Sequence, residues 1–73
     1  MSPSLPAVSG EDTIKALAKV GFERTSQRGS HVKLRHEDGL VVIVPLHSEL
    51  ARGTLRSILR QAGLAPEEFA KLL

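Results

Sequence analysis

The 73-residue chain contains no cysteine, tryptophan or tyrosine, and Phe22 and Phe69 are its only phenylalanines. Without cysteine there is no disulfide framework and no thiolate zinc site, so we expect packing alone to hold the fold, as in a reducing cytosol. Without tryptophan or tyrosine, the chain lacks the aromatic platforms on which single-stranded nucleic acids usually stack. Affinity for a nucleic acid would therefore have to come mainly from phosphate contacts.

Long apolar segments are also missing. The longest apolar run, Leu40 to Leu46, is far shorter than the roughly 20 residues of a membrane-spanning helix, and no signal-peptide pattern opens the sequence. We therefore expect a cytoplasmic protein with no membrane partner. A chain of this length has room for one hydrophobic core. We place a disordered lead-in, proline-containing and without periodicity, at residues 1–8 and a single domain at residues 9–73.

Two segments have the apolar spacing of amphipathic helices. The first covers residues 10–20, follows a capping Ser9 and ends before Gly21. The second covers about residues 53–62 and ends at Gly63, and its pattern is the strongest in the chain. The apolar positions of this second helix are Leu55, Ile58, Leu59 and Ala62.

Three strands are predicted between these helices. Residues 22–28 and 31–36 flank the turn signal Gly29-Ser30, and the second of these segments alternates cleanly between apolar and polar residues. The Asp38-Gly39 dipeptide, typical of hairpins, precedes a β-branched strand at residues 40–44. The economical arrangement is a three-stranded antiparallel meander.

A short third helix is predicted from Pro66, with Phe69 on its apolar side. The element order is thus α-β-β-β-α with a terminal helical turn, an α+β fold. Because the helices and the sheet have one apolar face each, we expect both main helices to pack on the same face of the sheet. The opposite face is left to solvent, and it carries His31, Lys33 and Arg35.

Basic charge is concentrated in the middle of the chain. Residues 24–60 contain seven Lys or Arg and three Asp or Glu, whereas the net charge of the whole chain is +2. Arg52, Arg56 and Arg60 are spaced by four and would form one ridge along a helix. Guanidinium groups hold phosphates in a bidentate manner. A solvated helix face is the commoner meaning of such a pattern, so the ridge alone does not establish binding.

The three histidines differ in their surroundings. His31 follows the Gly29-Ser30 turn and shares its face with Lys33, where an imidazole can move protons while cations hold a phosphate. An exposed histidine usually has no function, so the residues alone leave this open. His36 is interpreted as a hairpin-end residue, and His47 as a loop residue. Their spacing is not that of metal ligands, and we predict neither a metal nor another cofactor.

Three stretches carry a resemblance to a known family. They read GFERTSQRGSHVKL from Gly21, VVIVPLHSEL from Val41 and RGTLRSILRQAGLAPEEFAKLL from Arg52. The shared motifs are GSH at residues 29–31, VPxH at residues 44–47 and the segment at residues 53–63. In this order and spacing, the sequence resembles the HicA toxin family, also called YcfA-like, from about Thr13 to its last residue.

The resemblance implies a double-stranded-RNA-binding-domain-like fold and an mRNA endoribonuclease, the toxin of a type II toxin-antitoxin system. It implies mRNA and a HicB-type antitoxin as partners, and it places the family's catalytic histidine on His31. RNA is cut when its own 2′-OH is deprotonated and aligned, so a general acid/base and cations suffice without metal. We expect His47 as a possible accessory catalytic residue. The expected RNA contacts are Arg28, Ser30, Lys33, Arg35 and Arg56.

One position departs from the family pattern. Many members carry a basic residue where this chain has Ser26, so we expect that phosphate contact either to be weaker or to be supplied by Arg24 or Arg28. Two other functions stay open. A non-catalytic double-stranded RNA-binding module has the same element order, but relies on lysines at the start of its last main helix, where this chain has residues 52–56 with two arginines. The other alternative is a protein-interaction domain with an unused basic face.

Overall fold

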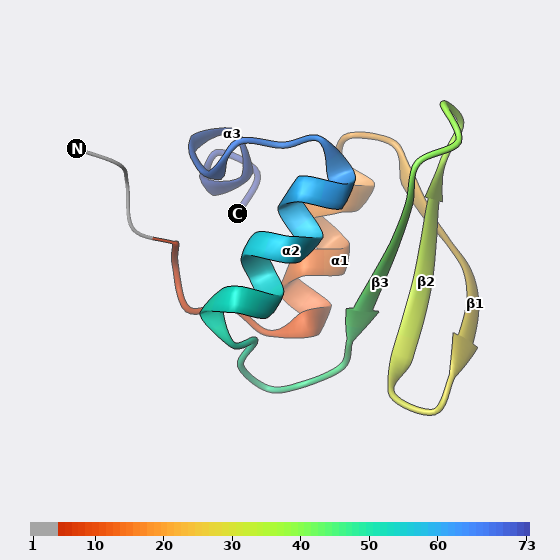
Figure 1. The fold of residues 1–73 in the computed structure, drawn as a ribbon, viewed down its shortest axis with the longest axis horizontal. Coiled ribbons are helices and arrows are strands. Elements are labelled where there is room, and N and C mark those ends of the chain that lie inside the picture. Colours follow the sequence, from red (N-terminus) through yellow and green to blue (C-terminus); the bar gives the residue numbers. More distant parts are fainter. Residues whose placement is uncertain (1–4) are drawn as a thin grey trace.

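The structure is a computed structural model that describes residues 5–73. Its three strands form one antiparallel sheet in the order β1-β2-β3, and the helices all lie on one side of this sheet (Figure 1). This arrangement confirms the predicted α+β fold with its α-β-β-β-α order. The elements are α1 (Gly10–Ala18), β1 (Phe22–Arg28), β2 (His31–His36), β3 (Val41–Pro45), α2 (Arg52–Ala62) and α3 (Pro66–Ala70).

Local capping groups define both main helices. At the start of α1, the Ser9 Oγ accepts a hydrogen bond from the Asp12 N–H at 2.9 Å, as its sequence predicts. The helix ends at Ala18, two residues earlier than expected, because the chain turns there toward Gly21, whose φ is +97°. Gly63 ends α2 in the left-handed conformation that glycine adopts without steric cost.

The strands follow the predicted hairpins with two differences. β3 begins one residue later than expected and includes Pro45, which terminates it. The register between β1 and β2 shifts between Arg24 and Ser26, so Thr25 forms a β-bulge. Such an extra residue leaves no signature in the alternation of a short polar strand, and the sequence did not indicate it.

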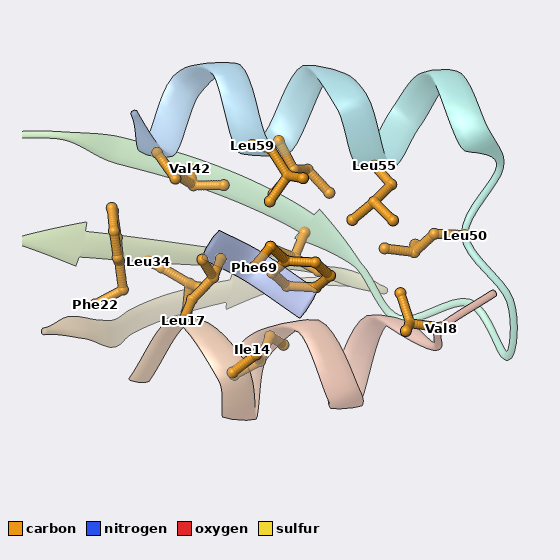
Figure 2. Packing of buried hydrophobic residues seen from close by; sticks show 14 of the residues in the cluster. Val8, Ile14, Leu17, Phe22, Leu34, Val42, Leu50, Leu55, Leu59 and Phe69 are labelled. Atoms are coloured by element: carbon orange, nitrogen blue, oxygen red, sulfur yellow. The ribbon is translucent and has the colours of Figure 1, made fainter. Parts of the chain in front are cut away.

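The core lies between the sheet and the helices. The inner side chains of β2 and β3, namely those of Val32, Leu34, Val42 and Val44, are fully buried. Figure 2 shows Leu34 and Val42 facing apolar residues of α1 and α2, with the ring of Phe69 from α3 between the two helices. Because Phe69 is completely buried, the short third helix completes the core and is more than a terminal turn.

The segment before α1 is attached to the loop between β3 and α2. Residues 1–4 of the predicted disordered lead-in lie outside the described residues. Val8, its last residue, is instead buried, and its carbonyl accepts a hydrogen bond from the Leu50 N–H at 2.8 Å. The Gly10 N–H donates to the His47 carbonyl at 2.9 Å, and a Cβ at Gly10 would overlap the Pro45 carbonyl oxygen. This close approach fixes the loop that follows β3.

The longest helix, α2, has 11 residues. Within residues 5–73, no helix combines the length and hydropathy needed to cross a membrane.

Candidate active site

The side of the sheet that faces away from the helices carries most of the predicted site. Residues paired across neighbouring antiparallel strands point to the same face of a sheet, so the register assembles side chains into rows. Three rows cross this open face from β1 through β2 to β3. They are Glu23–Arg35–Val41, Ser26–Lys33–Ile43 and Arg28–His31–Pro45.

Two of these rows enclose a depression around His31. Its volume is about 390 Å³, and it is lined by Ser26, Arg28, His31, Lys33 and Ile43. All five side chains belong to exposed residues, so an extended polymer reaches them without any opening of the fold. Within residues 5–73, the His31 ring makes no hydrogen bond, and its nitrogens are available to a ligand.

The position of His31 follows from the hairpin that precedes it. Arg28 and His31 pair directly around the two-residue turn Gly29-Ser30, and Gly29 has a φ of +58°, as a tight hairpin turn requires. On the other side His31 pairs with Pro45. The Leu46 N–H donates to the Ser30 carbonyl at 2.7 Å, which ties the turn to the end of β3. The backbone of His31 is therefore held from both neighbouring strands.

Among residues 5–73, no carboxylate forms an ion pair with the cations beside His31. Within the part of the chain that the structure describes, two basic side chains lie near a carboxylate: Arg24 forms an ion pair with Glu11 at 3.1 Å, and the His36 Nδ1 lies 3.5 Å from the Asp38 carboxylate. Neither pair includes Arg28, Lys33 or Arg35. A depression with an imidazole and two unpaired cations can hold a phosphate and exchange a proton with it or with a neighbouring hydroxyl.

The structure distinguishes the two residues expected to replace the missing cation at Ser26. Arg24 pairs with Leu34, so its side chain lies on the inner side of the sheet, where its guanidinium binds the Glu11 carboxylate of α1. Arg28 lines the same depression as Ser26. Arg28 therefore lies where it could supply the contact expected near Ser26, whereas Arg24 lies on the other side of the sheet.

The remaining predicted site residues lie around this depression or away from it. Arg35 occupies the next row and borders a second depression that also includes Glu23 and Glu37. Ser30 is exposed in the hairpin turn. His47 is exposed in the loop two residues after Pro45 and does not line the depression.

Arg56 belongs to a different surface. It lies on α2, in the helix layer, and borders a depression of about 290 Å³ with Leu59, Arg60, Leu64 and Pro66. No residue of the sheet lines this depression. The structure thus brings Arg28 and Lys33 to His31 and leaves Arg56 apart from them.

His36 has a packing role. Its side chain is 18% exposed, its ring centroid lies 5.1 Å from that of Phe22, and its Nδ1 accepts a hydrogen bond from the Asp38 N–H at 3.0 Å. The ring also lies against Gly21, where a Cβ would come within 2.9 Å of the His36 Nε2. This confirms a hairpin-end residue that points toward the core side, away from the open face.

Ile43 was not expected at the site. It is 43% exposed and contributes an apolar wall to the depression around His31. The alternation of β3, with Val42 and Val44 inward, contained the signal, because it directs Ile43 to the face of His31. Within residues 5–73, no cluster of three or more His, Cys, Asp or Glu is placed to hold a metal ion.

The chain is similar to known proteins over most of its length. The family model for the HicA toxin of bacterial toxin-antitoxin systems matches residues 10–64. A solved chain from a toxin-antitoxin complex of Streptococcus pneumoniae is similar with a TM-score of 0.69 and 33% sequence identity. The similarity covers 78% of this chain and 98% of that one. No curated protein matches.

Proposed function

The chain belongs to the HicA toxin family of bacterial toxin-antitoxin systems, and from this premise we propose that it is an endoribonuclease that cleaves mRNA. His31 is its general acid/base, and no metal takes part. The observation that carries the proposal is the depression in which His31 lies between Arg28 and Lys33, both without a carboxylate partner among residues 5–73.

The chemistry requires few groups from the protein. The 2′-hydroxyl of RNA lies next to the phosphate that is to be cleaved, so the nucleophile is already part of the substrate. His31 accepts the proton of this hydroxyl, the 2′ oxygen attacks phosphorus, and the bond to the 5′ oxygen breaks. Arg28 and Lys33 stabilise the charge that develops on the phosphoryl oxygens. The leaving 5′ oxygen takes a proton from His47 or from water.

The RNA contacts divide between two surfaces. Arg28, Lys33 and Arg35 bind phosphates along the open face, with Ser30 as a hydrogen-bonding group at the turn. Arg56 lies on the helix layer, so a phosphate bound there belongs to a segment of RNA outside the cleavage site. Since the chain has no tryptophan or tyrosine, we expect phosphate contacts rather than base stacking to dominate the affinity.

The activity of a toxin has to be silenced by its antitoxin, and we propose a HicB-type protein as the partner. The solved chain from Streptococcus pneumoniae comes from a toxin-antitoxin complex, which supports a protein partner of this kind. A partner with an acidic or hydrogen-bonding surface would cover His31 and the cations together, because complementary charge speeds encounter. We expect a small HicB-type gene beside the gene of this chain.

The proposed function is tested with three purified polymers of one sequence: a single-stranded RNA, the same RNA as a duplex, and the corresponding DNA, all with EDTA present. We expect cleavage of the single-stranded RNA and none of the DNA, which lacks the 2′-hydroxyl. Binding of the duplex without cleavage of any RNA would instead identify a non-catalytic RNA-binding module. Loss of RNA cleavage in EDTA, with recovery on adding Mg²⁺, would contradict the metal-free mechanism.

A further inference from the structure

The outer edge of β3 is an unpaired strand edge. The strand order β1-β2-β3 leaves β1 and β3 at the two sides of the sheet. The His36 N–H donates to the Leu40 carbonyl, and the Leu46 N–H donates to the Ser30 carbonyl. In an antiparallel ladder, alternate residues bond to the neighbouring strand. The even-numbered residues of this segment therefore bond to β2, and the backbone groups of Val41 and Ile43 point outward.

These outward groups have no partner in the described part of the chain. Apart from the ladder with β2, no hydrogen bond within residues 5–73 involves the backbone of Val41 or Ile43. The two residues are 40% and 43% exposed. Helix α2 packs against the side of β3 on which Val42 and Val44 are buried. It leaves the side chains of Val41 and Ile43 uncovered.

The two edges of the sheet differ in how they are protected. Proteins protect edge strands from pairing with other chains by bulges and by charged side chains. β1 has both, since it contains the bulge at Thr25 and the charged residues Glu23, Arg24 and Arg28. β3 has neither, and its sequence from Val41 to Pro45 is entirely apolar. An edge of this kind is suited to receive a strand from another protein.

We propose that an extended segment of the antitoxin pairs with this edge as a fourth strand beside β3. The inference rests on the proposed function, because that function supplies the partner. The segment bonds to the outward N–H and C=O groups of Val41 and Ile43 and places apolar side chains next to theirs. Strands lie about 4.8 Å apart, so the added strand runs about 10 Å from β2. A glutamate on it reaches the Lys33 ammonium.

The charge of the open face favours an acidic segment over a second copy of this chain. Pairing β3 with β3 of another copy would add a second set of Arg28, Lys33 and Arg35 to the same face and raise its positive charge, whereas an acidic segment lowers it. An antitoxin strand also ends beside Pro45, the direct neighbour of His31. One segment therefore supplies affinity at the edge and places its side chains beside the site.

Amide hydrogen exchange tests the pairing directly. The ¹⁵N-labelled chain is measured alone and with the HicB-type antitoxin encoded beside it. We expect exchange at the Val41 and Ile43 amides to slow at least tenfold in the complex. The amides of Val42 and Val44 already bond to β2 and serve as internal controls. Slowed exchange around His31 with unchanged exchange at Val41 and Ile43 would overturn the proposal.

A pair of variants at one position adds an affinity measurement. Val41→Pro removes an outward N–H that makes no hydrogen bond among residues 5–73, and a proline is tolerated at the first residue of an edge strand. Val41→Thr keeps this N–H and the β-branched shape. We expect Val41→Pro to weaken antitoxin binding at least tenfold and Val41→Thr less than threefold. RNA cleavage by the free variants should match that of the unmodified chain, because Val41 does not line the depression around His31.

The remaining outcomes are also decisive. Equal affinities for the two folded variants would overturn the edge pairing, as would failure of the antitoxin to bind the unmodified chain. If Val41→Pro does not fold, the exchange measurement on the unmodified chain decides. Protection of the Val41 and Ile43 amides from exchange without antitoxin, if it grew with the concentration of the chain, would assign the edge to a second copy. This result would contradict the proposal. RNA cleavage by the free chain is measured separately, so a failed edge leaves the proposed function standing.

Discussion

The two faces of the sheet differ in what their residues do, although they come from the same strands. In β2, Val32 and Leu34 are fully buried against the helices, whereas His31, Lys33 and Arg35 are exposed on the other side. The period of two in a strand thus separates the residues that stabilise the fold from those that form the candidate site. Substitutions on the open face should therefore change RNA chemistry with little effect on folding, and substitutions on the inner face should do the reverse.

The largest expected effect comes from the inner face. Leu34 is completely buried, so Leu34→Ala removes core contacts and leaves a cavity that costs about 2 to 5 kcal/mol of unfolding free energy. This is a large fraction of the total stability of so small a domain, roughly 5 kcal/mol. Urea unfolding should show a strongly lowered midpoint. The neighbouring Lys33→Ala is the control, and similar loss of stability in both variants would contradict the division between the faces.

A smaller effect is expected at the end of the hairpin. His36→Ala removes the ring that packs on Phe22 and the Nδ1 acceptor of the Asp38 N–H, and should cost about 1 kcal/mol. RNA cleavage per folded molecule should stay unchanged, because His36 does not line the depression around His31. Thermal unfolding and a cleavage assay on the same preparation measure both quantities. A cleavage defect in the folded variant would place His36 in the chemistry.

The smallest effect concerns the salt dependence of RNA binding. Each phosphate contact adds about 0.7 to the slope of log affinity against log salt for single-stranded substrates. Lys33→Gln removes one cation from the open face and should lower this slope by about that amount. Arg24→Gln is the matched control, since its guanidinium lies on the other side of the sheet in an ion pair with Glu11. Equal slopes for the two variants would contradict phosphate binding at Lys33.

Much of the fold could be predicted because its signals are local. The cap at Ser9, the stop at Gly63 and the alternation of β2 each depend on a few neighbouring residues. The same alternation assigned His31 and Lys33 to one face. These are the features in which backbone preference and hydrophobic pattern agree.

The rest depends on contacts between distant parts of the chain. Nothing near Arg24 in the sequence indicates that Glu11 forms an ion pair with it, because the packing of α1 against β1 brings the two together. Val8 is buried through a bond to Leu50, and Arg56 is separated from His31 by the packing of α2 on the inner side of the sheet. Such placements follow from tertiary packing, which the local pattern does not contain.

The central claim is that His31 performs the proton transfer while the surrounding cations bind the RNA. The most direct test compares His31→Ala with the unmodified chain for cleavage rate, RNA affinity and thermal stability in one set of conditions. We expect cleavage to fall at least about 100-fold, as for loss of a general acid/base, with affinity and stability nearly unchanged. Cleavage by His31→Ala at a rate close to that of the unmodified chain would contradict the claim.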